Sequence, residues 1–200
     1  MIGKIRKSRN MRFESNGIIL RDYMMSDVND EVRWSTTETD WIALDTPWEE
    51  IEQEDPETIR QDMLSYVMMS TRIPDTVTRP RLEIEADGRH IGFVSSYYLD
   101  SGYNETDWNP EFSSGYRNAI GIEICDRKSR NKGYGQKALK AYMEYHKAHG
   151  IKSLCIETTP ENEAMVHIAE KLGFNLVKKD IGAHEKDGRS WDNLVYEISL

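Results

Sequence analysis

Two glycines, Gly133 and Gly135, stand among the cationic residues Arg130, Lys132 and Lys137, directly before a segment with helical spacing of apolar residues. Glycine has no Cβ, so its backbone can turn tightly and approach a ligand closely. The first amide N–H groups of a helix have no intrahelical acceptor, and the helix dipole favours an anion at that end. These features are typical of a phosphate-binding turn.

A turn that only connects two elements is the alternative for the same residues. The segment lacks the Gly-Lys-Ser/Thr ending of a P-loop, and it also lacks the third glycine of the dinucleotide-binding fingerprint. The glycines alone therefore leave both interpretations open, and the elements around them have to decide between the two.

The neighbouring elements favour phosphate binding. Residues 119–125, AIGIEIC, alternate as in a strand, with the isoleucines on one face and Glu123 and Cys125 on the other. After the turn, Leu139, Tyr142 and His146 recur at spacings of three and four, which predicts a helix. This order places the turn at the carboxyl end of a strand, where open α/β sheets bind ligands.

The remaining chain predicts one α/β domain. The expected strands are 17–23, the two arms of a hairpin at 81–99 that turns at Asp87-Gly88, 119–125, 151–158, 174–180 and 192–200. The other expected helices are one that is capped by Ser26 and runs to about Trp34, one at 56–71 with Met68 on its inner face, and one from Pro160 to Gly173.

The composition limits the possible partners. The chain has 200 residues and a formal net charge of -9, which suits one domain and argues against a surface for nucleic acid or anionic membranes. Residues 1–16 are expected to form a basic, solvated tail that is not a secretory signal, and residues 17–200 a single domain. Cys125 and Cys155 lie in apolar strands, so free thiols in a reducing cytoplasm are expected.

Two motifs resemble those of the GNAT superfamily of N-acetyltransferases. The first family motif, Gln/Arg-x-x-Gly-x-Gly/Ala, is matched by RNKGYG at 130–135, and the second, Asn-x-x-Ala-x-x-Leu-Tyr-x-Lys-x-Gly-Phe, by NEAMVHIAEKLGF at 162–174. Each motif is weak alone, but both lie on the expected elements, about thirty residues apart. The resemblance covers residues 119–174, and the order of the strands extends it to most of the chain. The general layout is similar to that of ribosomal-protein N-terminal acetyltransferases.

The resemblance implies a mixed, mostly antiparallel sheet of about seven strands that is splayed between the fourth and fifth strands and flanked by helices. It also implies that backbone N–H groups of the glycine turn bind the pyrophosphate of acetyl-CoA without a metal. The implied cofactor-binding residues are Cys125, whose backbone would bind the pantetheine arm, Arg130, Asn131, Lys132, Gly133, Tyr134, Gly135, Gln136 and Asn162. The alternative for Asn162 is a polar residue that satisfies a backbone N–H in the first helical turn.

Two glutamates are candidates for the base that acetyl transfer to an amine requires. A primary amine is mostly protonated at neutral pH, so a base has to take a proton before the nitrogen attacks a thioester. Glu157 is the first candidate, because it stands five residues before Asn162, where several family members carry a glutamate base. Glu123 on the neighbouring strand is the second. A solvated strand carboxylate is the alternative for each of them.

The general acid departs from the family pattern. The tyrosine that often protonates the leaving thiolate in the family is replaced by Ala169. Tyr134, Tyr196, a water molecule or no acid at all are the options that remain, and the sequence does not choose among them.

The acceptor is expected to lie against two acidic segments, residues 38–62 and 100–118. Carboxylates with aromatic side chains suit a cationic amine, and a solvated acidic surface is the alternative. The predicted function is acetyl-CoA-dependent transfer to a protein N-terminus or a small cationic amine, by direct attack in a ternary complex, with the protein as a monomer or homodimer. An acyl-CoA-binding module without turnover and a structural domain whose turn binds nothing are the rivals.

Overall fold

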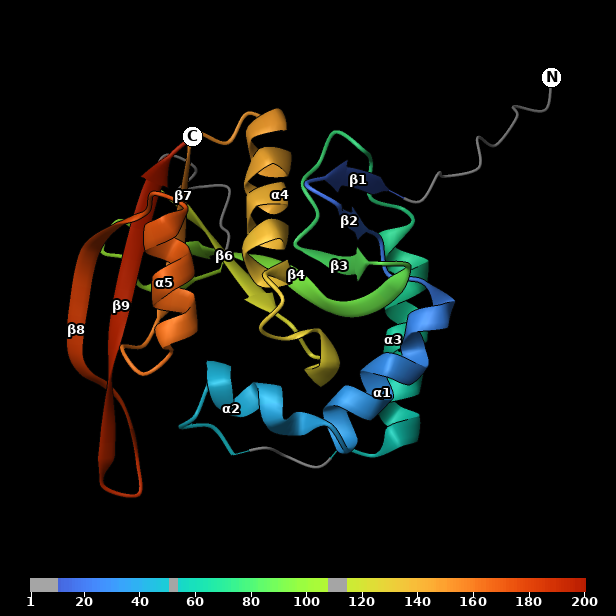
Figure 1. The fold of residues 1–200 in the computed structure, drawn as a ribbon, viewed down its shortest axis with the longest axis horizontal. Coiled ribbons are helices and arrows are strands. Elements are labelled where there is room, and N and C mark those ends of the chain that lie inside the picture. Colours follow the sequence, from blue (N-terminus) through green and yellow to red (C-terminus); the bar gives the residue numbers. More distant parts are fainter. Residues whose placement is uncertain (1–10, 51–53, 108–114) are drawn as a thin grey trace.

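One twisted sheet organises the chain in the computed structural model, which describes residues 11–50, 54–107 and 115–200 (Figure 1). Its strands are β1 (Arg12–Ser15), β2 (Ile18–Arg21), β3 (Arg81–Ala86), β4 (Arg89–Leu99), β5 (Glu105–Thr106), β6 (Arg117–Glu123), β7 (Ser153–Thr158), β8 (Asn175–Lys186) and β9 (Arg189–Ser199). The helices are α1 (Val28–Thr36), α2 (Ile42–Asp45), α3 (Pro56–Ser70), α4 (Tyr134–Ala148) and α5 (Glu163–Lys171). Short 3-10 turns are η1 (Met25–Asp27), η2 (Thr39–Trp41) and η4 (Arg127–Ser129).

The strand order is β1-β2-β3-β4-β6-β7-β9-β8, with β5 paired to β4. All described pairings are antiparallel except that of β6 with β7, which is parallel. In the described residues these two strands share one register pair, Ala119 with Cys155. Beyond Ala119, β6 continues to Glu123 without a partner on that side, so the expected splay of a mostly antiparallel sheet is confirmed.

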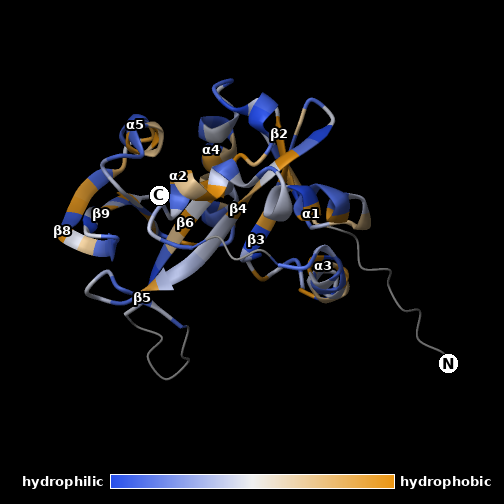
Figure 2. Cartoon of the chain, turned by 90° about the horizontal axis from the view of Figure 1, so that it is seen from below, coloured by the Kyte–Doolittle hydropathy of each residue, from blue (hydrophilic) through white to orange (hydrophobic). Residues whose placement is uncertain are grey.

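Helices cover both faces of the sheet (Figure 2). Side chains alternate between these two faces along each strand, so one strand contributes to both layers. Leu82 and Ile84 of β3 belong to the main apolar core, which they share with Tyr142 of α4. Glu83, between them in sequence, points to the opposite face, where α1 supplies Glu31 to the same ion-pair network. The apolar core therefore lies under α4 and α5, and a buried polar layer lies under α1.

The sheet has nine strands where about seven were expected. Asn16 and Gly17 both have positive φ and form a tight turn that pairs β1 with β2. Four residues of the segment expected to be tail therefore form strand β1. The second addition is β5, which pairs with the end of β4. Residues 1–10 of the expected tail lie outside the described residues.

The predicted cap of the first helix is wrong. Residues 25–27 form a 3-10 turn, so α1 begins at Val28 and Asp27, not Ser26, stands at the cap position. Asp27 is held there by Arg21, whose Nη1 lies 2.6 Å from its Oδ2. This buried ion pair joins residues only six positions apart in the chain, and it fixes Asp27 at the start of the helix.

Two further helix details differ from the expectation. Met68, expected on the inner face of α3, is 62% exposed because it lies half a turn away from Ile59, the residue that anchors this helix in the core. The helix expected to begin at Pro160 begins at Glu163 instead. Asn162 caps it by accepting a hydrogen bond from a backbone N–H of the first turn.

Gly92 of β4 sets the contact between β4 and the end of β6. Its φ is +150°, and a Cβ at this position would lie 1.9 Å from the carbonyl oxygen of Glu123. The residue follows a register shift between β3 and β4, which accommodates the unusual backbone. Only glycine allows the two strands to approach this closely.

Replacing Gly92 by alanine is expected to lower the free energy of unfolding by about 2–4 kcal/mol, because the methyl group has no room unless a strand moves. Urea denaturation measures the loss. Gly88→Ala is the matched control, since Gly88 also has positive φ but no atom lies within 4 Å of its Cβ position. Equal losses in both variants would contradict the close approach of β4 to β6.

Candidate active site

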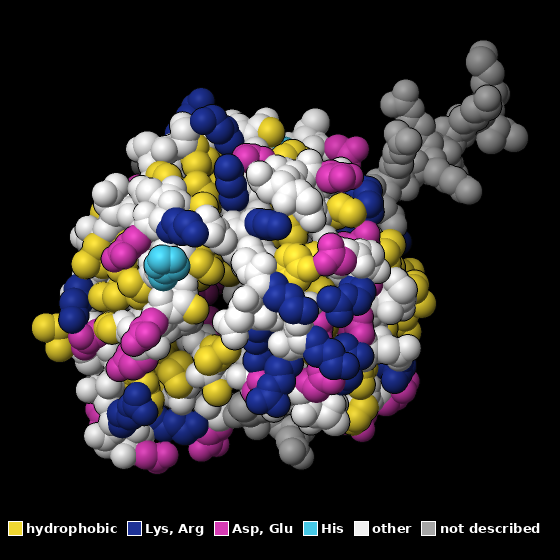
Figure 3. All heavy atoms as spheres, in the orientation of Figure 1, with side chains coloured by type: hydrophobic (Ala, Val, Ile, Leu, Met, Phe, Trp, Pro, Cys, Tyr) yellow, Lys and Arg dark blue, Asp and Glu magenta, His cyan; other side chains and the backbone are white. Residues whose placement is uncertain are grey.

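A cavity of about 830 Å³ opens where β6 parts from β7. Figure 3 shows the hollowed face of the molecule, between α5, the N-terminal end of α4 and α2. The residues that line it come from α2 and its preceding turn, from the end of β6, from the glycine turn and from the start of α5. They include Asp40, Trp41, Leu44, Asp45, Ile122, Glu123, Ile124, Arg130, Asn131, Gly133, Tyr134, Gly135, Gln136, Asn162 and Ile168.

The glycine turn brings a row of unpaired backbone donors to this cavity. Gly133 stands at the cap position of α4 with φ +78°, and Asn131 also has positive φ. In the described part of the chain, the backbone N–H groups of residues 131–136 donate no hydrogen bond. Such a row at the N-terminal end of a 15-residue helix suits phosphate oxygens.

Arg130 is engaged by the protein itself. Its Nε donates to the carbonyl oxygen of Ile124 at 2.8 Å, and its Nη2 donates to that of Cys125 at 3.0 Å. Its Nη1 lies 2.6 Å from Oδ2 of Asp40, an ion pair that holds the pKa of Asp40 below its usual range. The side chain thus joins the end of β6 to the segment before α2, and its charge in the cavity is already neutralised.

Asn162 fits both interpretations of its role. Its Oδ1 accepts a hydrogen bond from the backbone N–H of Met165, so it caps α5. Its Nδ2 donates to the carbonyl oxygen of Leu44 at 3.0 Å, so it also ties α5 to α2. The residue lines the cavity, and the second N–H of its amide is not used in the hydrogen bond to Leu44.

Two of the expected cofactor-binding residues are not among those that line the cavity. Cys125 is fully buried just beyond β6, and burial raises the pKa of its thiol far above the ordinary value. Lys132 is exposed on the turn. The structure therefore places neither residue in the lining of the cavity.

Glu123 is the candidate base that the structure places in the cavity. Its Oε2 is buried and has no hydrogen-bond partner among the described residues. Burial and then the carboxylate of Asp45 raise the pKa of Glu123 to about 8, against the opposing effect of Arg81. A carboxyl group with a pKa near neutrality can take up and release a proton at working pH.

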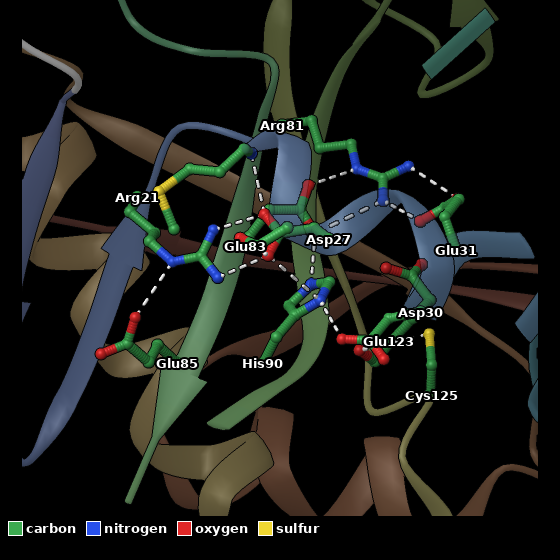
Figure 4. A network of polar contacts seen from close by, with 12 residues as sticks. Arg21, Asp27, Asp30, Glu31, Arg81, Glu83, Glu85, His90, Glu123 and Cys125 are labelled. Atoms are coloured by element: carbon green, nitrogen blue, oxygen red, sulfur yellow. Dashed lines mark hydrogen bonds and ion pairs between the residues drawn. The ribbon is translucent and has the colours of Figure 1, made fainter. Parts of the chain in front are cut away.

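A buried network of ion pairs lies on the same face of the sheet (Figure 4). Arg81 is 2.8 Å from both Glu83 and Glu31, and Nε2 of His90 is 2.8 Å from Glu83. Burial alone would lower the pKa of His90, but hydrogen bonding to Glu83 and the charges of Glu83 and Asp27 raise it. Arg81 and His90 are therefore already paired with carboxylates.

Glu157 is held outside the observed lining of the cavity. Its Oε2 accepts a hydrogen bond from the hydroxyl of Tyr97 at 3.0 Å, and its Oε1 accepts one from Nδ2 of Asn193 at 2.8 Å. Burial, together with Glu157, raises the pKa of Tyr97 well above its ordinary value. Both oxygens of Glu157 therefore have hydrogen-bond partners, whereas Oε2 of Glu123 has none among the described residues.

The candidates for the general acid are also constrained. Ala169 is fully buried in the core and has no proton to donate. The hydroxyl of Tyr134 donates to the carboxyl group of Asp87 in the β3–β4 turn. Tyr196 is 4% exposed and is not among the residues that line the cavity.

The two acidic segments differ in their relation to the cavity. The first segment supplies Asp40 and Asp45 to the cavity lining. No motif indicated these two residues, but the acidic run that contains them and Trp41 had indicated the segment as part of an acceptor site. Of the loop at 100–118, residues 108–114 lie outside the described residues, and none of the others lines the cavity. Asp100 in that loop accepts hydrogen bonds from backbone N–H groups of its own turn.

Neither a metal site nor a membrane-spanning helix is found among the described residues. No group of three or more His, Cys, Asp or Glu side chains in this part of the chain is arranged to hold a metal ion. None of the described helices is long and apolar enough to cross a membrane.

The comparison with protein families identifies the class. Residues 18–175 match the family described as acetyltransferase (GNAT) domain. Because this match covers most of the chain, the protein belongs to the GNAT acetyltransferase family, and the enzyme class inferred from the two motifs is confirmed. No curated protein sequence matches the chain significantly.

Solved structures share the fold at low sequence identity. RimL, a ribosomal L7/L12 alpha-N-protein acetyltransferase in complex with coenzyme A, is 17% identical with a TM-score of 0.70, over 95% of this chain and 98% of that one. YncA, a putative acetyltransferase from Salmonella typhimurium with its cofactor acetyl-CoA, is 18% identical with a TM-score of 0.63, over 92% and 95%. A GNAT-family acetyltransferase from Bacillus anthracis is 15% identical with a TM-score of 0.67, over 94% and 98%.

Proposed function

We propose that this protein transfers the acetyl group of acetyl-CoA to a primary amine by direct attack within a ternary complex. The observation that carries the proposal is the content of one cavity: unpaired backbone N–H groups at the start of α4 and the unpaired carboxyl group of Glu123. The N–H groups suit a pyrophosphate, and the carboxyl group suits a proton from an amine.

The proposed cofactor contacts follow from this geometry. The N–H groups of residues 131–136 bind the pyrophosphate, and the pantetheine arm runs along the unpaired side of β6 toward Glu123. Asn162 lines the same cavity and binds the arm through the second N–H of its amide, while the first stays on the carbonyl of Leu44. Similar structures with coenzyme A or acetyl-CoA bound support the assignment of acetyl-CoA as the co-substrate.

Glu123 is the proposed base. It accepts a proton from the acceptor ammonium, and the freed nitrogen lone pair attacks the carbonyl carbon of the thioester. The carbon–sulfur bond then breaks, coenzyme A leaves as a thiolate, and the nitrogen gives up its second proton to water to form the neutral amide. With the site empty, Glu123 is mostly protonated at neutral pH, and an approaching ammonium favours its ionised form.

The leaving thiolate has no assigned acid in this proposal. Ala169 replaces the tyrosine of the family motif, and the hydroxyl of Tyr134 is bound to Asp87. The thiolate is a fair leaving group, so its departure needs only water. This arrangement predicts that turnover is limited by removal of the amine proton rather than by protonation of the sulfur.

An acyl-CoA-binding module without turnover is the second candidate function, and one observation favours it. The position of the family's acid is occupied by a buried alanine, so a group associated with catalysis in relatives is missing. Such a module would use the same N–H groups for the pyrophosphate and would leave Glu123 without a chemical role.

A panel of amines with acetyl-CoA tests the proposal. The thiol released on transfer is measured with each amine, including peptides with a free N-terminus and small diamines. Amine-dependent release by the wild-type protein is expected, together with binding of acetyl-CoA in calorimetry. Binding without release for every amine would favour the binding module, and the absence of binding would refute both functions.

A further inference from the structure

We propose that Asp45 binds a second positive charge of the acceptor, so that this protein acts on diamines or polyamines. The inference rests on the proposed acetyl transfer and names the class of its acceptor. Its geometric basis is that Asp45, the last residue of α2, and Glu123, the last residue of β6, line the same cavity from different elements.

Neither carboxyl group has a counterion. In the described part of the chain, no ion pair or hydrogen bond engages the side chain of Asp45. Oε2 of Glu123 is buried and unpartnered. By contrast, Asp40 on the same segment as Asp45 is paired with Arg130 at 2.6 Å. The cavity therefore holds two carboxyl groups that the protein leaves unneutralised.

The cations around the cavity are engaged by other carboxyl groups, and Arg127, which lines it, lies 3.7 Å from Asp40. Arg81 is already 2.8 Å from Glu31 and from Glu83. Arg130 donates to two carbonyl oxygens as well as to Asp40. Asp45 and Glu123 are thus both left to pair with a cation of the ligand.

The charge of Asp45 disfavours the ionised form of Glu123 in the empty cavity. Asp45 is open to solvent at the cavity mouth, yet partial desolvation and the carboxylate of Glu49 raise its pKa. Its own charge in turn raises the pKa of Glu123 and contributes to the raised pKa of Tyr97. A bound cation would relieve this repulsion and favour the ionised forms.

The wall beside Asp45 suits the carbon chain of a diamine. Trp41 and Leu44 from the same segment line the cavity, with apolar surface that methylene groups can cover. One ammonium can then reach Glu123 for reaction while the other pairs with Asp45. A peptide with a single ammonium would form only one of these two ion pairs, so the diamine is the better match.

The test compares cadaverine, a five-carbon diamine, with pentylamine, which has the same chain and one ammonium. Asp45→Asn is expected to raise KM for cadaverine about fivefold and to leave KM for pentylamine unchanged. Glu50→Gln is the matched control, because Glu50 is exposed, close in sequence and not among the cavity-lining residues. It removes the same charge and should change neither value.

Calorimetric titration of cadaverine into the protein bound to coenzyme A gives a second readout that needs no turnover. Weaker binding by Asp45→Asn would support the inference even if no amine were acetylated, a result that would overturn only the proposed function. Equal affinity of wild type and Asp45→Asn for cadaverine, with equal KM changes for the two amines, would overturn the inference. The acceptor would then be better described as a peptide N-terminus recognised by shape.

Discussion

Replacing Glu123 by glutamine is expected to lower turnover by about 10²-fold, because the amide keeps the shape of the side chain but cannot accept the amine proton. The pH profile separates this effect from a structural one. In the wild-type protein, kcat/KM should rise with pH up to a pKa of about 8, the value to which burial and Asp45 raise Glu123. The variant should lack this rise in kcat/KM, while the effect of the ionisation of the amine itself remains in both pH profiles.

Stability provides a control that does not depend on activity. The pKa of Glu123 rises from an ordinary 4.5 to about 8 on folding, so the folded protein retains a proton that the unfolded chain releases between these values. The wild-type protein should therefore lose stability as pH rises through this window, and Glu123→Gln should not. Thermal unfolding at several pH values measures the difference, which should grow from about pH 5 to about pH 8 in favour of the variant.

Glu157→Gln is the matched comparison for the base. Both oxygens of Glu157 accept hydrogen bonds from Tyr97 and Asn193, so this variant is expected to lose less than about tenfold in turnover. A 10²-fold loss in Glu157→Gln with little change in Glu123→Gln would show that Glu157 is the base. That outcome would mean that the Tyr97 and Asn193 contacts open when the ligands bind.

Gly135→Asp should weaken acetyl-CoA binding at least tenfold, or about 1.4 kcal/mol. A Cβ at this position would lie 3.6 Å from Cδ1 of Ile168, an ordinary contact, so the helix can accommodate the change. The new carboxylate would stand in the first turn of α4, beside the N–H groups proposed to bind the pyrophosphate, and would repel it. Calorimetry of acetyl-CoA binding measures the loss.

Gly115→Asp is the control for that change in charge. No atom lies within 4 Å of the Cβ position of Gly115, and this residue is not among those that line the cavity. Its acetyl-CoA affinity should equal that of the wild-type protein. Unchanged affinity in a folded Gly135→Asp protein would remove the phosphate-binding role of the turn.

The parts of the fold that depend on neighbouring residues could be predicted from the sequence. The Asp87-Gly88 turn has positive φ at both residues, as its hairpin requires, and Asp187-Gly188 repeats this between β8 and β9. The glycine turn could be placed because the strand and helix on either side of it carry clear periodicities. These features need only local geometry, which the sequence expresses directly.

The contents of the site could not be predicted in the same way, because they depend on pairs that are distant in the chain. In the sequence, Arg130 resembles a phosphate ligand. In the structure it binds Asp40, which lies 90 residues earlier in the chain. The ranking of Glu157 before Glu123 rests on spacing in the motif, which does not show that Tyr97 and Asn193 donate hydrogen bonds to Glu157. A residue's availability depends on what the folded chain places beside it, and neither spacing nor residue type records that.

The most direct test of acetyl transfer is the mass of the products formed from acetyl-CoA with an isotopically labelled acetyl group. The protein is incubated with labelled acetyl-CoA alone and then with an amine that it accepts. The account predicts that the label appears in the amide of the amine only when protein, acetyl-CoA and amine are all present, and that the protein itself gains no acetyl group. Labelled acetyl-CoA that binds but never transfers its label to any amine would contradict the account.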